Sequence, residues 1–138
     1  LRLEKNWGAW TLDFRPDFTA AETGLDMFIN WNKNFIGKEP ALSEKKRGPE
    51  KKMTVMTVDT NDIDVTNDEA ILKNDKCVGY VTSGGYAHHV KKSIAIGYIP
   101  VELANHGESL NIEINGKTYI ANVIEKPLYD PDGKKMKS

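Results

Sequence analysis

Two runs of alternating apolar and polar residues flank an Asn-Gly pair in the stretch Leu110-Asn-Ile-Glu-Ile-Asn-Gly-Lys-Thr-Tyr-Ile-Ala-Asn-Val123. Alternation with a period of two residues is typical of a strand that buries one face. Asn-Gly is the favoured pair for a two-residue type I′ turn, so we expect Asn115 and Gly116 at the tip of a β-hairpin. This register places five apolar side chains on one face, namely Leu110, Ile112, Tyr119, Ala121 and Val123.

Three further segments that precede this hairpin have the composition of strands. They are rich in β-branched and aromatic residues and comprise Met53–Val58, Cys77–Val81 and Ile94–Tyr98. Ser83-Gly84-Gly85-Tyr86 follows the second segment, and we expect a tight hairpin there whose glycines adopt positive φ. The acidic stretch from Asp59 to Asp75 predicts a solvated connection. It fails as an EF-hand loop, because Asn67 and Lys73 stand where Gly and Glu are needed.

The N-terminal part of the chain has a different character. Residues 1–36 contain all three tryptophans, Trp7, Trp10 and Trp31, but show no helical or strand period. They are interpreted either as a loop-rich cap over the C-terminal domain or as one wall of a ligand site. Residues 37–47 predict a short helix with Pro40 in its first turn, and Gly48-Pro49 ends it. The chain is therefore expected to be mainly β, with an irregular, partly helical N-terminal arm.

Composition restricts the classes of function. The 138 residues carry a net charge of −1, which argues against nucleic acid or an anionic membrane as a partner. The single cysteine, Cys77, excludes an internal disulfide and a cysteine-based zinc cluster. His88, His89 and His106 lack the spacing of metal ligands, so we expect no metal site. These features favour a soluble intracellular protein, and the start at Leu1 without Met suggests a piece of a longer chain.

Several runs in a fixed order resemble the C-terminal third of the glycine cleavage T-protein family of folate-dependent aminomethyltransferases. The runs are Leu1-Arg2-Leu3-Glu4-Lys5, Thr19-Ala20-Ala21-Glu22-Thr23-Gly24-Leu25, Asn34-Phe35-Ile36-Gly37-Lys38-Glu39, Thr82-Ser83-Gly84-Gly85-Tyr86 and Lys92-Ser93-Ile94-Ala95-Ile96-Gly97-Tyr98-Ile99. Two more, Phe14-Arg15-Pro16 and Pro127-Leu128-Tyr129-Asp130-Pro131, resemble the branch that is fused to flavin-dependent sarcosine and dimethylglycine dehydrogenases.

The resemblance implies a fold and a function. Residues 51–138 would form a six-stranded Greek-key barrel, and residues 1–50 would be the tail end of the folate-binding body. The full-length parent would transfer a one-carbon unit from an amine to tetrahydrofolate, giving methylenetetrahydrofolate. FAD would be present only if an oxidoreductase domain lies upstream. The parent would work in the bacterial cytoplasm or, in a eukaryote, in the mitochondrial matrix.

The resemblance also assigns one site residue. The family's catalytic Asp and its pterin-binding residues lie upstream of the Leu-Arg-Leu-Glu run, so no catalytic residue is expected here, and the chain alone is expected to be inactive. Arg2 matches an Arg that contacts folate, and a guanidinium can clamp the carboxylates of the folate tail. A structural interpretation remains open, in which Arg2 pairs with Glu22 or with a helix end.

The expected partner is the N-terminal folate-binding body, without nucleic acid or membrane. The exposed aromatic arm of a chain that lacks this body is expected to self-associate. The alternative function is a free-standing β-barrel that binds a protein or nucleic acid.

Overall fold

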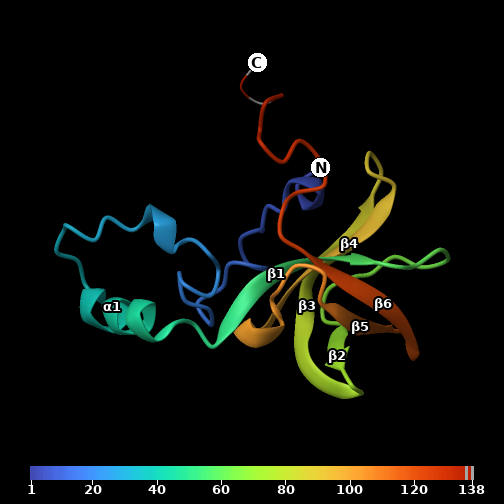
Figure 1. The fold of residues 1–138 in the computed structure, drawn as a ribbon, viewed down its shortest axis with the longest axis horizontal. Coiled ribbons are helices and arrows are strands. Elements are labelled where there is room, and N and C mark those ends of the chain that lie inside the picture. Colours follow the sequence, from blue (N-terminus) through green and yellow to red (C-terminus); the bar gives the residue numbers. More distant parts are fainter. Residues whose placement is uncertain (136, 138) are drawn as a thin grey trace.

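The computed structural model describes residues 1–135 and 137, and its strands form one closed antiparallel barrel (Figure 1). Around the barrel the strands follow the order β1-β4-β3-β2-β5-β6, and β6 closes the ring against β1. Their bounds are β1 Lys51–Val58, β2 Ala70–Lys73, β3 Lys76–Ala87, β4 Lys92–Pro100, β5 Ser109–Ile114 and β6 Lys117–Ile124. The long connection from β1 to β2 and the meander that returns β4 beside β1 form a Greek key. The predicted fold class is confirmed.

The hairpin of β5 and β6 has the predicted register. Ile114 pairs with Lys117, Ile112 with Tyr119 and Leu110 with Ala121. Asn115 and Gly116 have φ values of 49° and 76°, as a type I′ turn requires. Five apolar residues of this hairpin, Leu110, Ile112, Ile114, Ala121 and Val123, line the barrel interior together with Met56, Val58, Val81 and Ile99 from other strands. The strands therefore close into a barrel because each contributes an apolar face to one shared core.

Two predictions about the first half of the barrel were wrong. The acidic stretch is not wholly a connection, because its last residues form β2, which pairs with both β3 and β5. Ser83-Gly84-Gly85 is not a turn either, since it lies inside β3, and the hairpin turn comes later, at residues 88–91. Of the two glycines, Gly85 alone has positive φ. Gly84 instead permits a close approach, because a Cβ there would lie 2.5 Å from the carbonyl oxygen of Val65.

The N-terminal arm contains short helices joined by irregular backbone. Two 3₁₀ turns span Leu3–Lys5 and Asp26–Phe28, and α1 spans Lys38–Arg47, which confirms the predicted helix to within one residue. A third 3₁₀ turn, Val101–Leu103, follows β4. Within the described part of the chain, no helix is long and apolar enough to cross a membrane.

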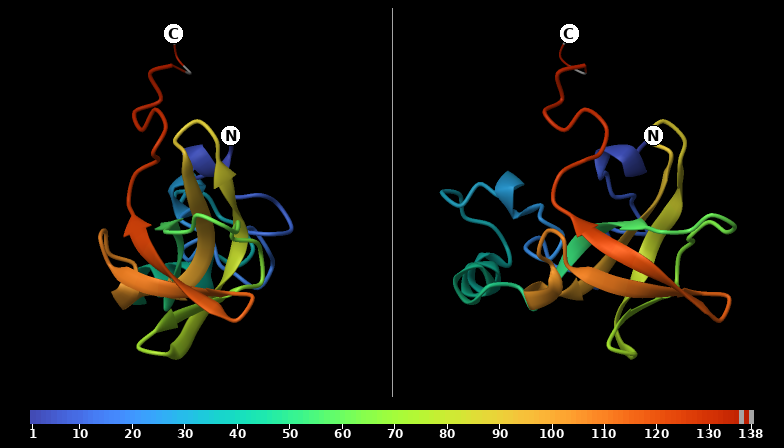
Figure 2. Two further views of the ribbon diagram at one scale, coloured as in Figure 1. Left: turned by 90° about the vertical axis from the view of Figure 1, so that its right-hand side faces the viewer. Right: turned by 45° about the vertical axis from the view of Figure 1, so that its right-hand side comes forward.

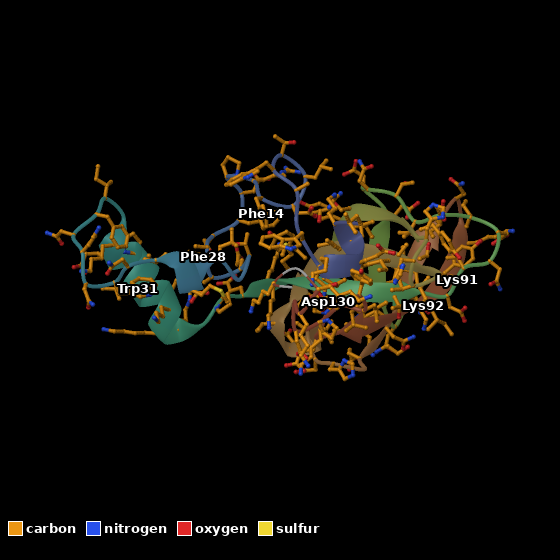
Figure 3. All side chains as sticks on the ribbon, turned by 90° about the horizontal axis from the view of Figure 1, so that it is seen from above. Phe14, Phe28, Trp31, Lys91, Lys92 and Asp130 are labelled. Carbon is orange, nitrogen blue, oxygen red and sulfur yellow. The ribbon has the colours of Figure 1, made fainter. Side chains whose placement is uncertain are left out.

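The arm contacts the barrel at one end and extends away from it at the other. The first 3₁₀ turn lies beside β3 and β4, whereas the segment with α1 projects to the side of the barrel, as Figure 1 and the right view of Figure 2 show. No described residue of α1 is buried. We name residues 25–47 the lobe. Figure 3 shows Phe28 and Trp31 on this lobe, at the opposite end of the molecule from Lys91 and Lys92.

Candidate functional site

The run Leu1-Arg2-Leu3-Glu4-Lys5 lies where the β3–β4 hairpin meets the segment that follows β6. Leu3 packs against a small apolar cluster on the outside of the barrel that includes Ile94 and Ile96. Because alternate side chains of a strand point to opposite faces, β4 contributes side chains both to the barrel core and to this outer cluster. The run is thereby attached to the outside of the barrel by its apolar residue.

Glu4 attaches the run to the turn between β3 and β4. Its side chain is 4% exposed, and Oε1 accepts hydrogen bonds from the backbone N–H groups of His89 (2.8 Å) and Val90 (3.3 Å). A carboxylate buried to this extent needs such donors, because its desolvation costs free energy. Glu4 therefore satisfies two backbone donors of the turn and fixes the turn against the arm.

Lys5 attaches the run to the C-terminal segment. Its ammonium Nζ donates to the carbonyl oxygen of Asp130 (2.6 Å) and lies 3.5 Å from the carboxylate of the same residue. Partial desolvation raises the pKa of the Asp130 carboxyl, but the backbone N–H of Lys135 and the charge of Lys5 outweigh it, so the pKa lies below its usual value. Two of the runs that carried the family resemblance thus contact each other although about 125 residues separate them.

Arg2 points from the same run toward β3. Its Nη1 lies 3.4 Å from Oδ2 of Asp13 and donates to the carbonyl oxygen of Trp7 (3.3 Å), while Nη2 donates to Oγ of Ser83 (3.1 Å). A guanidinium has five N–H donors, so these contacts leave two of them free. The side chain is 39% exposed. Arg2 can therefore still bind an anion from solvent.

Asp13 is the residue around which this part of the arm is organised. It is completely buried, and its carboxylate accepts hydrogen bonds from the backbone N–H of Ala9 (2.7 Å), the hydroxyl of Ser83 (2.7 Å) and the hydroxyl of Thr82. The hydroxyl of Tyr98 donates to its backbone carbonyl (2.8 Å). The sequence reasoning did not identify Asp13. Its hydroxyl partners, Thr82 and Ser83, lie 69 and 70 positions away, so no local sequence pattern connects them with it.

Tyr98 connects this network to an aromatic contact. Its ring stacks on Phe18 of the arm, with centroids 3.5 Å apart and planes 6° from parallel. Burial raises the pKa of the Tyr98 hydroxyl, and the nearby charge of Asp13 raises it further. The hydroxyl therefore stays protonated and continues to donate its hydrogen bond to the arm.

Glu22 is not a partner of Arg2. It forms a capping box with Thr19, in which the Thr19 N–H donates to the Glu22 carboxylate (2.9 Å) and the Glu22 N–H donates to the Thr19 hydroxyl (3.2 Å). Its carbonyl oxygen accepts a hydrogen bond from the N–H of Met53 (2.8 Å), which fixes the arm to β1. The alternative pairing considered for Arg2 was therefore wrong, and the acid beside Arg2 is Asp13.

An apolar cleft of about 600 Å³ lies between the arm and the C-terminal segment. Its lining includes Trp7, Phe14, Met27, Phe28 and Met53. Arg2 is not among the lining residues of the cleft, but its guanidinium donates a hydrogen bond to the backbone carbonyl of Trp7, which is one of them.

The three histidines do not form a site. His88 packs edge-on against the ring of Tyr86, and His89 packs edge-on against that of Tyr129. Nδ1 of His106 accepts a hydrogen bond from the backbone N–H of Glu125. Among residues 1–135 and 137, no group of three or more His, Cys, Asp or Glu side chains could hold a metal ion.

The chain is similar to known proteins over nearly its whole length. Residues 51–130 match the family described as the glycine cleavage T-protein C-terminal barrel domain. Human mitochondrial dimethylglycine dehydrogenase is 39% identical over 130 residues, which are 93% of this chain and 15% of that protein. An aminomethyltransferase of Synechocystis is 35% identical over 136 residues, 97% of this chain and 36% of that protein. The crystal structure of the glycine cleavage system aminomethyltransferase T from Bartonella henselae superposes with a TM-score of 0.88 at 25% identity, covering 95% of this chain and 37% of that one.

Proposed function

The chain belongs to the family of glycine cleavage T-protein C-terminal barrel domains, and we propose that it is the C-terminal part of a tetrahydrofolate-dependent aminomethyltransferase. It spans about a third of the length of the aminomethyltransferases it matches and 15% of the dimethylglycine dehydrogenases. A full-length protein of this kind would transfer a one-carbon unit from an amine to tetrahydrofolate, in the bacterial cytoplasm or the mitochondrial matrix. FAD would belong to it only if a dehydrogenase domain precedes this chain. These similarities do not favour a free-standing binding module.

The observation that carries the proposal is the position of Arg2. Its guanidinium is partly exposed, has two N–H donors without a partner among the described residues, and is hydrogen-bonded to Trp7, a residue that lines the aromatic cleft. We infer that it binds a carboxylate of the glutamyl tail while the cleft contributes contacts to the rings. Tetrahydrofolate, when bound, accepts the one-carbon unit. The residues of this chain would bind and orient the folate, and the folate-binding body upstream would supply the catalytic groups.

The exposed apolar side chains of the arm support a partner on this face. Trp10, Met27, Phe28 and Ile36 are each more than 70% exposed. Large apolar side chains that are exposed to this extent often mark an interaction site when they gather on one face. We propose that the folate-binding body covers the lobe and the cleft in the full-length protein. Without that body, the same surface would drive the chain to self-associate, which sedimentation at micromolar concentration would detect.

Calorimetric titration with tetrahydrofolate tests the proposal. A solvent-exposed Arg–carboxylate pair contributes about 0–1 kcal/mol, whereas micromolar affinity needs about 8 kcal/mol. The chain alone should therefore show no binding tighter than millimolar. The chain expressed with its folate-binding body should bind at micromolar concentration or tighter. Micromolar binding by the chain alone would instead favour a barrel with a site of its own.

Substitution of Arg2 tests its role in the same assay. In the full-length protein, Arg2→Ala should weaken tetrahydrofolate binding roughly 10- to 100-fold, because a charge-assisted hydrogen bond is lost. Amine oxidation at any flavin domain should be unaffected. Arg15→Ala is the matched control, since the Arg15 side chain is also 39% exposed and pairs with Asp17. Equal losses for the two variants would argue against a specific folate contact of Arg2.

A further inference from the structure

We propose that the Asp13 carboxylate and the Ser83 hydroxyl are positioning groups for Arg2, which hold its guanidinium in the orientation that receives a folate carboxylate. This inference rests on the proposed function, because Asp13 and Ser83 would act through Arg2. It adds two residues that the sequence reasoning had not connected with folate binding.

The geometry links Arg2 to the rigid barrel through Asp13. Oδ2 of Asp13 lies 3.4 Å from Nη1 of Arg2 and accepts a hydrogen bond from Oγ of Ser83, which in turn accepts one from Nη2. The three groups thus form a closed triangle with two contacts on the guanidinium. Ser83 is 2% exposed and belongs to β3, which pairs with β4 on one side and with β2 on the other. The guanidinium is therefore fixed relative to the barrel.

The complete burial of the Asp13 carboxylate indicates that its charge does more than contribute to packing. A carboxylate without solvent contact is costly to desolvate, and replacing a buried ionic pair by apolar residues is often neutral or stabilising. Asp13 is completely buried, yet Arg2 is 39% exposed. The buried member of the pair thus orients a cation whose side chain is still partly exposed to solvent.

Holding Arg2 in place should raise the affinity for an anion. The side chain of Arg has one of the largest rotamer entropies. An Arg that is flexible in the free protein loses this entropy when the ligand binds. Ordering it beforehand removes that cost from the binding step. Ordering this one side chain before binding should lower the dissociation constant about 2- to 12-fold.

A double-mutant cycle in the full-length protein that carries this chain tests the inference. Ser83→Ala and Asp13→Asn are each made with Arg2 and with Arg2→Ala, and tetrahydrofolate affinity, KM for folate and kcat are measured. Ser93→Ala is the matched control, because Ser93 is also 2% exposed on the neighbouring strand β4, and its hydroxyl has no hydrogen-bond partner among the described residues. Circular dichroism confirms that each variant is folded.

We expect the two substitutions to lower tetrahydrofolate affinity only when Arg2 is present. With Arg2 present, both substitutions should weaken tetrahydrofolate binding about 2- to 12-fold and raise KM, while kcat at saturating folate and the Ser93→Ala control stay unchanged. In the Arg2→Ala background the same substitutions should change affinity by less than about 2-fold. If Asp13→Asn does not fold, Ser83→Ala decides the outcome.

Three results would overturn the inference, and they differ in what they imply. If Asp13→Asn and Ser83→Ala weaken tetrahydrofolate binding equally in the presence and absence of Arg2, these residues only maintain the fold. The same conclusion follows if neither substitution weakens binding when Arg2 is present. Arg2→Ala binding tetrahydrofolate as tightly as the wild type would remove the proposed role of Arg2 as well.

Discussion

Removing the Glu4 carboxylate should weaken the docking of the arm on the barrel without unfolding the barrel. Glu4 is 4% exposed, and its Oε1 accepts hydrogen bonds of 2.8 and 3.3 Å from the N–H groups of His89 and Val90. A hydrogen bond to a charged group contributes roughly 1.5–3 kcal/mol. Since the second bond is long, we expect Glu4→Ala to reduce the free energy of arm docking by about 2–4 kcal/mol.

Urea unfolding with two probes measures this loss. All three tryptophans lie within residues 1–36, so their fluorescence reports on the arm, whereas far-ultraviolet circular dichroism reports mainly on the strands. With an m-value of about 2 kcal/mol/M, Glu4→Ala should lower the midpoint of the fluorescence transition by about 1–2 M. The circular dichroism transition should move much less.

Glu113→Ala is the control for the loss of a carboxylate. Glu113 is exposed on β5, so its substitution should change stability by less than about 0.5 kcal/mol. Fluorescence midpoints that agree for Glu4→Ala and Glu113→Ala would refute the reasoning. A common shift of both probes in Glu4→Ala would show that arm and barrel unfold as one unit.

Three further predictions concern the turn, a close contact and pH. Gly116→Val should destabilise the protein by roughly 1–3 kcal/mol, because a β-branched residue is forced to a φ of 76°; an unchanged melting temperature would contradict the turn type. Gly84→Ala should cost about 1–3 kcal/mol in thermal unfolding, since its Cβ would lie 2.5 Å from a backbone oxygen. The pKa of Asp130 is lowered in the folded state, so its contribution to stability is present above its usual pKa of 3.8 and is lost as the pH falls through the lower folded value. Asp130→Asn should flatten the dependence of the melting temperature on pH in that acidic range, and an unchanged dependence would exclude the pairing with Lys5.

The parts of the fold that local sequence determines were predictable. The β5–β6 hairpin follows from the Asn-Gly turn and a period of two residues, and both are properties of neighbouring residues. Helix α1 follows in the same way from Pro40 in its first turn and Gly48 after its end. The closed six-stranded barrel did not follow from these signals, and it was predicted only through the resemblance to a family.

The features that were missed depend on residues far apart in the chain. Strand β2 has only four residues and is half-buried because β3 and β5 flank it, which its own composition does not indicate. Gly84 permits close approach of a segment nearly twenty residues upstream, so a local interpretation as a turn was natural. Asp13 is separated from Thr82 by 69 positions. A single sequence offers no signal that joins such residues.

The central claim is that this chain completes a folate-dependent aminomethyltransferase and that Arg2 contributes to folate binding. The most direct test measures methylenetetrahydrofolate formed from an amine and tetrahydrofolate by the full-length protein, with wild-type Arg2 and with Arg2→Ala. We predict product from both, with a KM for tetrahydrofolate roughly 10- to 100-fold higher for Arg2→Ala and a similar kcat at saturating folate. No methylenetetrahydrofolate from the wild-type protein, or the same KM for both proteins, would contradict the account.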